Sequence, residues 1–209
     1  MGNKIKRCVI ISGAPENEIS YYNDYISDSF VISADSGYDK CVRLGITPNL
    51  IIGDFDSSSE PHTDIEKIVL PVQKDDTDTF FSVKQAVERG FNDIIILGGI
   101  GSRVDHTYAN ILCLNYCFER NVKCSLINKN NRISVISGEN IISRGIYKCF
   151  SLYPLFDKCE GVSIKNADYP LDNACVLPSE QFMQSNAFKG DTASVSVKKG
   201  KLLLIMSND

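Results

Sequence analysis

Short apolar segments alternate with helical patterns along the first part of the chain, and this alternation restricts the fold more than any other feature. Segments rich in branched residues predict strands at residues 7–11, 30–34, 50–52, 68–70, 94–97 and 123–127. Between them, Thr77 predicts a helix start, Gly45 and Gly90 predict helix ends, and residues 105–118 form a third helical pattern. Strands and helices that alternate at this length form parallel sheets with helices on both faces. The sequence therefore predicts a three-layer α/β/α domain with a mostly parallel sheet over residues 1–127.

The pattern changes near Asn128. Glycine, asparagine, aspartate and proline then separate short segments at residues 132–137, 140–143, 149–154, 161–165, 193–197 and 202–206. Helical periodicity is nearly absent there, and residues 193–197 alternate as a half-buried strand does. We expect residues 128–209 to form a second domain, an all-β sandwich.

Composition narrows the possible partners and the cellular compartment. The net charge of -4 argues against nucleic acid as a partner, and no apolar run is long enough to cross a bilayer, which argues against a membrane partner. The chain has 8 cysteines, but none forms a Cys-x-x-Cys pair. We interpret them as reduced, mostly buried thiols, which is typical of a cytoplasmic protein.

Carboxylates recur after the strands predicted for the sheet and in the loop before the helix that Thr77 is predicted to start. They are Asp35, Asp54, Asp56, Asp75, Asp76, Asp78 and Asp105. Ligands of open parallel sheets bind beyond the carboxyl ends of the strands, so these side chains are expected at one edge. Clustered carboxylates need cations or hydrogen-bond donors to stay ionised, and hard oxygen ligands suit magnesium shared with substrate phosphates. Asp54 and Asp56 are two residues apart, so in an extended segment both would point the same way and bind one ion or bracket two.

Each of these carboxylates also has a simpler interpretation. Asp35 and Asp105 are compatible with helix capping, residues 56–59 with an ordinary turn, and Asp75 and Asp76 with solvated loop charge. Capping does not predict that the carboxylates should follow successive strands of one sheet.

A glycine-rich loop follows the segment at residues 94–97. Backbone amides at Gly99 and Gly101 can approach phosphates closely, and Arg103 adds a cation with bidentate geometry for phosphate. The loop is not a dinucleotide-binding fingerprint, because Val104 stands where the last glycine belongs, and no P-loop motif occurs. Taken alone, this loop does not identify a function.

In combination, these motifs resemble those of the thiamine pyrophosphokinase family. The motifs are ISGAP at residues 11–15, ADSG at 34–37, GDFDS at 53–57, KDDTD at 74–78 and GGIGSRVDH at 98–106. The later segments GVSIK at 161–165 and QSN at 184–186 fit the same family. The resemblance runs in order over almost the whole chain.

The resemblance implies a function, a cofactor and an assembly. The function is transfer of a pyrophosphoryl group from ATP to thiamine, which gives thiamine diphosphate and AMP. The cofactor is Mg2+. The first domain would bind nucleotide and metal, and the second would bind thiamine and form a homodimer whose active sites are shared between subunits.

The resemblance also assigns roles to residues. It places the metal ligands at Asp54, Asp56 and Asp78, with Asp35 and Asp75 nearby. Arg103 would bind phosphate, Asp105 would lie near thiamine, and the remaining expected binding residues are Gly99, Gly101, His106, Ser185 and Asn186. Some members use a tryptophan near the substrate ring; this chain has no tryptophan, so Phe182 or Phe188 is expected to replace it.

Two other functions fit parts of the sequence. One is pyrophosphoryl transfer to another small alcohol, such as a hydroxymethylpterin. The other is a non-catalytic nucleotide- or thiamine-binding protein. Ser185 and Asn186 favour thiamine over the first alternative, and the complete set of carboxylates favours catalysis over the second.

Overall fold

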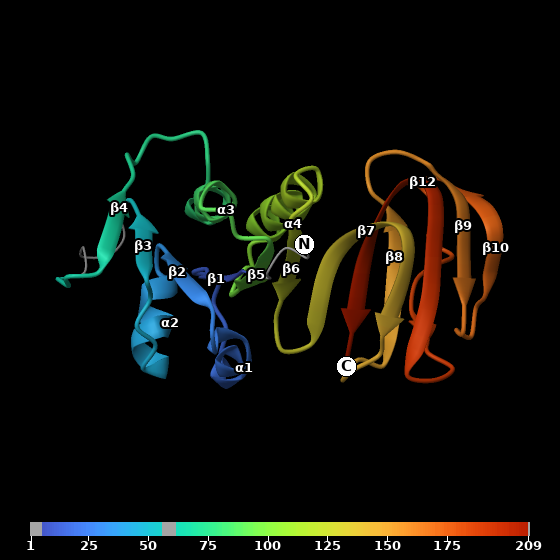
Figure 1. The fold of residues 1–209 in the computed structure, drawn as a ribbon, viewed down its shortest axis with the longest axis horizontal. Helices are drawn as coiled ribbons and strands as arrows, with labels where there is room; N and C mark the ends of the chain where they lie inside the picture. The colour runs from blue at the N-terminus through green and yellow to red at the C-terminus, as the bar shows by residue number, and fades with distance from the viewer. Residues whose placement is uncertain (1–5, 56–61, 209) are drawn as a thin grey trace. The chain divides into compact units, whose positions relative to one another are not determined.

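A computed structural model describes residues 6–55 and 62–208, and the chain divides into two compact units after Lys129. The elements of the first unit are β1 (Arg7–Ile11), η1 (Ser20–Tyr22), α1 (Asn23–Ile26), β2 (Phe30–Ala34), α2 (Gly37–Leu44), β3 (Leu50–Gly53), β4 (Glu66–Val69), α3 (Asp78–Glu88), β5 (Asp93–Leu97), α4 (Val104–Phe118) and β6 (Lys123–Ile127) (Figure 1).

The first unit is built on a parallel sheet with the strand order β6-β5-β1-β2-β3-β4. Neighbouring strands run parallel throughout the described sheet. Helices α1 and α2 lie on one face, and α3 and α4 lie on the other (Figure 1). The predicted three-layer α/β/α fold is therefore confirmed.

Both faces of this sheet are buried because helices cover them. Side chains alternate along a strand, so Val9 and Ile11 of β1 pack toward Tyr22 and Cys41, whereas Ile10 faces the opposite way. All of these side chains are fully buried. Burial on both faces explains why the strands read as continuous apolar runs in the sequence.

The helix boundaries follow local chemistry. The Thr77 hydroxyl accepts a hydrogen bond from the Phe80 amide and caps the start of α3, as predicted. Gly45 ends α2 with a φ of 66°, in the left-handed region that glycine adopts without steric strain. The sequence analysis did not predict the two short helices η1 and α1, which cover residues 20–26.

The second unit is an antiparallel β-sandwich. Its strands are β7 (Asn131–Ser143), β8 (Cys149–Pro154), β9 (Cys159–Lys165), β10 (Leu171–Val176), β11 (Asn186–Ala187) and β12 (Thr192–Ser207). The first half of β12 pairs with β7 and β9, and its second half pairs with β7 and β8. The predicted sandwich is confirmed, but segments 132–137 and 140–143 form one strand, as do 193–197 and 202–206, and β10 and β11 were missed.

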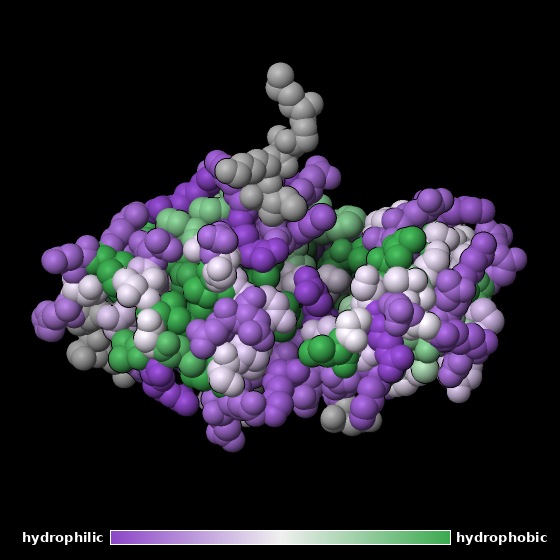
Figure 2. Space-filling view, turned by 60° about the horizontal axis from the view of Figure 1, so that its bottom comes forward, coloured by the Kyte–Doolittle hydropathy of each residue, from purple (hydrophilic) through white to green (hydrophobic). Residues whose placement is uncertain are grey.

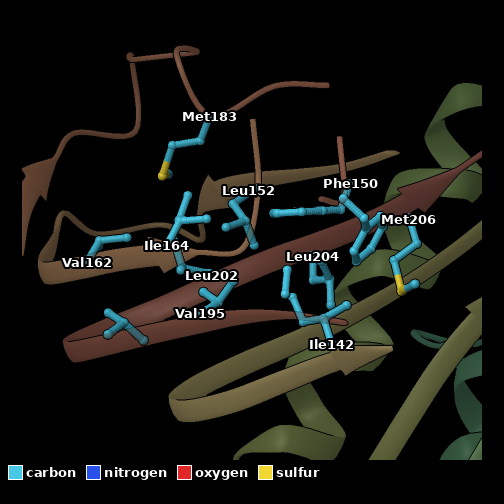
Figure 3. Close-up of a cluster of buried hydrophobic side chains, with 14 of the residues drawn as sticks. Ile142, Phe150, Leu152, Val162, Ile164, Met183, Val195, Leu202, Leu204 and Met206 are labelled. Carbon is cyan, nitrogen blue, oxygen red and sulfur yellow. The ribbon is translucent and has the colours of Figure 1, made fainter. Parts of the chain in front are cut away.

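The sandwich core depends on a register shift in the middle of β12, which changes which side chains point inward. Val195 and Val197 point inward before the register shift that separates Val197 from Leu202, and Leu202 and Leu204 point inward after it. The shift moves the apolar face from odd to even positions, which keeps both halves in one core. Figure 3 shows the side chains of Val195, Leu202 and Leu204 among those of β8 and β9, including the fully buried Phe150.

The eight cysteines agree with the sequence analysis. All cysteines are free thiols, and the buried ones are Cys8, Cys41, Cys113, Cys117, Cys124 and Cys159. None of the helices in residues 6–55 and 62–208 combines the length and apolar character that crossing a membrane needs. On the face drawn in Figure 2, hydrophobic residues form separate patches among hydrophilic ones.

Gly37 tests how tightly α2 packs on β1. A Cβ added at Gly37 would lie 2.0 Å from the carbonyl oxygen of Ile11, which is backbone and cannot rotate away. Gly37→Ala should therefore lower the free energy of unfolding by at least about 2 kcal/mol in urea denaturation. Gly190→Ala is the control, because a Cβ there meets no atom within 4 Å. Equal stability of the two variants would contradict this account of the packing.

Candidate active site

A cavity of about 400 Å³ lies at the carboxyl ends of the strands of the first unit. Its walls come from segments that follow the five strands β1 to β5 and from the starts of α3 and α4. They are residues Ser12, Gly13, Ala14, Pro15, Ala34, Asp35, Ser36, Asp54, Lys74, Thr77, Asp78, Thr79, Gly99, Gly101, Ser102, Arg103, His106 and Asn110. This is the edge at which the parallel-sheet rule places a ligand.

Three carboxylates meet in this cavity. Oxygen atoms of Asp35, Asp54 and Asp78 lie within 4.8 Å of one another. The sequence analysis placed Asp54 and Asp78 among the metal ligands and Asp35 only nearby, whereas the structure brings all three together. Asp56, the remaining predicted ligand, lies outside the described residues.

Asp35 reaches this position through an unusual backbone conformation. Its φ is 49°, in the left-handed region that aspartate tolerates better than most residues. Its amide donates a hydrogen bond of 2.7 Å to the Ile52 carbonyl, which ties the end of β2 to β3. Asp35 is not the N-cap of α2, because Ser36 holds that position, so the capping interpretation is wrong.

Lys74 neutralises part of this negative charge. Its Nζ lies 2.5 Å from Asp54 Oδ2 and 2.8 Å from Asp78 Oδ1. Burial raises the pKa of Asp78 and the charges of Asp54 and Asp35 add to this, while Lys74 acts in the opposite direction. Burial alone would lower the pKa of Lys74, but its bonds to the two carboxylates outweigh burial and raise that pKa. Sequence reasoning gave Lys74 no role, although its spacing from Asp78 is that of an i,i+4 ion pair.

The oxygen atoms of this group fit a hard cation. Asp35 Oδ1 is buried and makes no hydrogen bond, whereas the buried Asp78 Oδ1 has the Lys74 ammonium as its charged partner. A buried acceptor without a donor, such as Asp35 Oδ1, is costly in free energy and marks a place where a cation would be stabilised. The group contains neither thiolate nor imidazole, a donor set that suits magnesium better than zinc.

Arg103 and Asp105 pair with each other. The Arg103 guanidinium donates to both Asp105 carboxylate oxygens, at 3.2 and 2.6 Å. Hydrogen bonding to Arg103 lowers the pKa of Asp105 to about 2. Arg103 and His106 line the cavity, and Asp105 lies in the first turn of α4, whose N-cap is Arg103. Asp105 is therefore not a helix cap.

The glycines of the 98–101 loop permit close packing between loops. A Cβ at Gly98 would lie 2.4 Å from both Lys40 Nζ and the Ser12 carbonyl, and one at Gly101 would lie 2.9 Å from the Ala14 side chain. The Ala14 amide also donates to the Gly98 carbonyl at 2.9 Å. These contacts join the loop after β1 to the loop after β5, so both form one wall of the cavity.

A buried lysine stabilises the same wall. Lys40 of α2 donates to the Ser12 carbonyl at 2.8 Å and to the Ala14 carbonyl at 2.5 Å, and its Nζ lies over the Tyr22 ring. Burial lowers the pKa of Lys40 to about 8, with the charge of Glu16 opposing the shift. Sequence reasoning missed Lys40 because the pattern of α2 alone does not place it under the β1 loop.

The other acidic residues of the 74–78 segment lie apart from the carboxylate group. Asp75 is exposed, and Asp76 forms an ion pair with Lys84 of α3. The role expected for Asp75 near the metal stays a prediction.

The residues predicted in the second unit have different surroundings. Ser185 is exposed, and its amide donates to the Ser151 hydroxyl at 2.9 Å. Asn186 is buried, and its side-chain amide exchanges two hydrogen bonds with the backbone of Tyr169. Phe182 is 53% exposed, whereas Phe188 is buried against Phe150. Of the two phenylalanines, Phe182 is therefore the one available to a ligand.

Comparison with known protein families identifies the family to which the chain belongs. The family model described as thiamin pyrophosphokinase, catalytic domain, matches residues 22–126, and the one described as thiamin pyrophosphokinase, vitamin B1 binding domain, matches residues 131–202. The chain belongs to the thiamine pyrophosphokinase family.

Individual members of the thiamine pyrophosphokinase family resemble the chain over almost its whole length. The thiamine pyrophosphokinase of Bacillus subtilis is 30% identical, over 98% of this chain and 100% of that protein. A crystal structure of the Bacillus subtilis enzyme superposes with a TM-score of 0.91 at 27% identity, covering 98% and 100% of the two chains. A Geobacillus thermodenitrificans thiamin pyrophosphokinase shares the fold, with a TM-score of 0.84 at 22% identity over 97% and 98%.

Titration of Lys40 should be visible in the pH dependence of stability. Because the pKa of Lys40 falls from 10.5 to about 8 on folding, the unfolded chain binds more protons between these two pH values. The contribution of Lys40 to the free energy of unfolding should thus rise with pH from about 8 to 10.5, by about 3 kcal/mol.

The measurement is the difference in urea-unfolding free energy between the wild type and Lys40→Met from pH 7 to 10.5. Other titrating groups, such as the cysteines, cancel in this difference. A difference that stays constant or falls as the pH rises would contradict the assignment.

Proposed function

We propose that the chain transfers the pyrophosphoryl group of ATP to the hydroxyl of thiamine, giving thiamine diphosphate and AMP. The observation that carries this proposal is the group of Asp35, Asp54 and Asp78 inside a cavity of the unit that matches the family's catalytic domain. In this reaction the thiamine hydroxyl oxygen bonds to the β-phosphorus, the bond from that phosphorus to the oxygen of AMP breaks, and the hydroxyl proton is released.

We propose that Asp54 and Asp78, together with Asp56, hold Mg2+, with Asp35 close enough to share the task. When bound, the ion would offset the negative charge of the polyphosphate and of the leaving AMP. The support in the described residues is the buried Asp35 Oδ1, which makes no hydrogen bond, and the oxygens of Asp35, Asp54 and Asp78 that lie within 4.8 Å of one another. Asp75 is proposed to act from the rim.

Positioning of the phosphates is proposed for the loop after β5. Amides near Gly99 and Gly101 and the guanidinium of Arg103 would bind phosphate oxygens, and His106 lies beside them on the cavity wall. Asp105 would face the thiamine cation once Arg103 turns to the phosphates. Their ion pair is largely exposed, and exposed pairs contribute little stability, so opening it is compatible with this role.

Thiamine binding is proposed for the second unit, which matches the vitamin B1 binding domain. Ser185 and Phe182 are exposed on one segment, and Asn186 would act mainly by holding that segment against Tyr169. We further propose a homodimer with active sites shared between subunits. A cytoplasmic location fits the free thiols.

The assay is incubation with ATP, Mg2+ and thiamine, followed by chromatography of the products. We expect AMP and thiamine diphosphate in equal amounts, and no product in excess EDTA. Asp54→Asn should lower turnover by at least about 100-fold, since even residues that only support a metal ligand cost 10–100-fold.

Asp76→Asn is the matched control, because Asp76 pairs with Lys84 outside the carboxylate group, and it should keep wild-type turnover within about threefold. Full activity of Asp54→Asn would overturn the metal site. Transfer to a hydroxymethylpterin in place of thiamine, or binding without turnover, would overturn the proposed function.

Shared active sites can be tested with mixed dimers. Asp54→Asn is coexpressed with a variant that carries Phe182→Ala and Ser185→Ala, after each has been shown to be inactive alone. Random pairing makes about half of the dimers mixed, and each mixed dimer has one intact site, so about a quarter of wild-type activity should return. No recovery in verified mixed dimers, or a monomer in light scattering, would contradict the shared site.

A further inference from the structure

We propose that Lys74 is a built-in cation that holds the Asp35, Asp54 and Asp78 group together before metal binds. When metal takes these carboxylates, Lys74 transfers to the nucleotide phosphates. This inference rests on the proposed metal site and assigns a role to a residue outside it.

Lys74 lies between two of the three carboxylates, on the wall of the cavity. Its ammonium bridges Asp54 and Asp78 at 2.5 and 2.8 Å, and its side chain is 15% exposed. The same side chain lines the cavity. Lys74 therefore supplies positive charge where the carboxylates need it and where a metal ion would bind.

The Lys74 ammonium and a metal ion compete for the same carboxylates. Lys74 contacts one oxygen of Asp54 and one of Asp78, so a metal ion held by the same two carboxylates would lie close to the ammonium, and the two cations would repel each other at short range. Lys74 must therefore leave these oxygens when metal binds. Displacing Lys74 costs free energy, and this cost weakens metal binding in the absence of nucleotide.

The displaced Lys74 ammonium needs a new partner, and the nucleotide phosphates supply one. Asp76, a neighbouring carboxylate, is already paired with Lys84. The cavity beside Lys74 is lined by Gly13, Gly101 and Arg103, which are groups suited to phosphate. A lysine on a flexible stem can reach a phosphate there as a mobile point charge. Metal without nucleotide leaves Lys74 unpaired, whereas metal with nucleotide gives it a new partner.

This role predicts effects of opposite sign from one substitution. Lys74→Met should bind metal alone more tightly, because no cation has to be displaced. The same variant should bind nucleotide with metal more weakly, because the phosphate contact is lost. A lysine that only stabilises the fold would not strengthen metal binding, and a lysine that only binds phosphate would leave it unchanged.

The experiment titrates the full chain with Mn2+ and measures free Mn2+ by electron paramagnetic resonance, without nucleotide. Lys74→Met should lower the Kd for Mn2+ by about tenfold or more, since one unit charge is removed next to the site. Lys84→Met, which removes an equal charge from Asp76, should change it less than about twofold. With Mn2+ present, binding of a non-hydrolysable ATP analogue should weaken about tenfold in Lys74→Met only.

Lys74→Gln, which removes the charge but keeps a hydrogen-bond donor, replaces Lys74→Met if that variant does not fold. If Lys74→Met binds Mn2+ no more tightly than the wild type, Lys74 is not a cation that metal displaces. If Lys74→Met binds the analogue as tightly as the wild type, Lys74 does not transfer to the phosphates. Absence of Mn2+ binding to every variant, even with the analogue, would overturn the metal site itself. Each of these results is separate from the thiamine assay.

Discussion

Repulsion among carboxylates at one end of a parallel sheet is the constraint on which the first unit depends. The fold brings the ends of β2 and β3 and the start of α3 together, so Asp35, Asp54 and Asp78 meet there. Repulsion at this distance has to be offset, and Lys74 offsets part of it. Secondary structure and the ion pairs of Lys74 thus hold the charges of the site in place.

A second lysine performs a different task in the same unit. Lys40 binds backbone carbonyls of the loop after β1, while Lys74 binds carboxylates. Burial lowers the pKa of Lys40, because the carbonyls carry only partial charge and offset little of this cost, whereas the bonds of Lys74 to two carboxylates outweigh burial and raise its pKa. The opposite shifts distinguish a lysine that shapes the cavity wall from one that takes part in its electrostatics.

Local patterns predicted the local features and missed those set by distant contacts. The bounds of β1, β2 and β6 follow from apolar runs that end at polar or glycine residues. Strands β7 and β12 each appear as two segments in the sequence. In the structure each is continuous, because Gly138 and Glu139 of β7 pair with β12 and Lys199 of β12 pairs with β9. In the site, the positions of Asp54 and Asp78 were predictable from strand order. The inclusion of Asp35 depends on a left-handed backbone, and the positions of Lys74 and Lys40 depend on packing that no short motif encodes.

The central place of β12 has a consequence for how the chain is made. This strand is the last element described, yet it pairs with β7, β8 and β9. A nascent chain leaving the ribosome has every strand of the first unit once Ile127 has emerged, so that unit can fold during synthesis. The sandwich must wait for its final strand, and until then the side chains that will surround Phe150 have no core to join. Premature termination shortly before β12 would therefore yield a chain with a formed catalytic unit and an aggregation-prone tail.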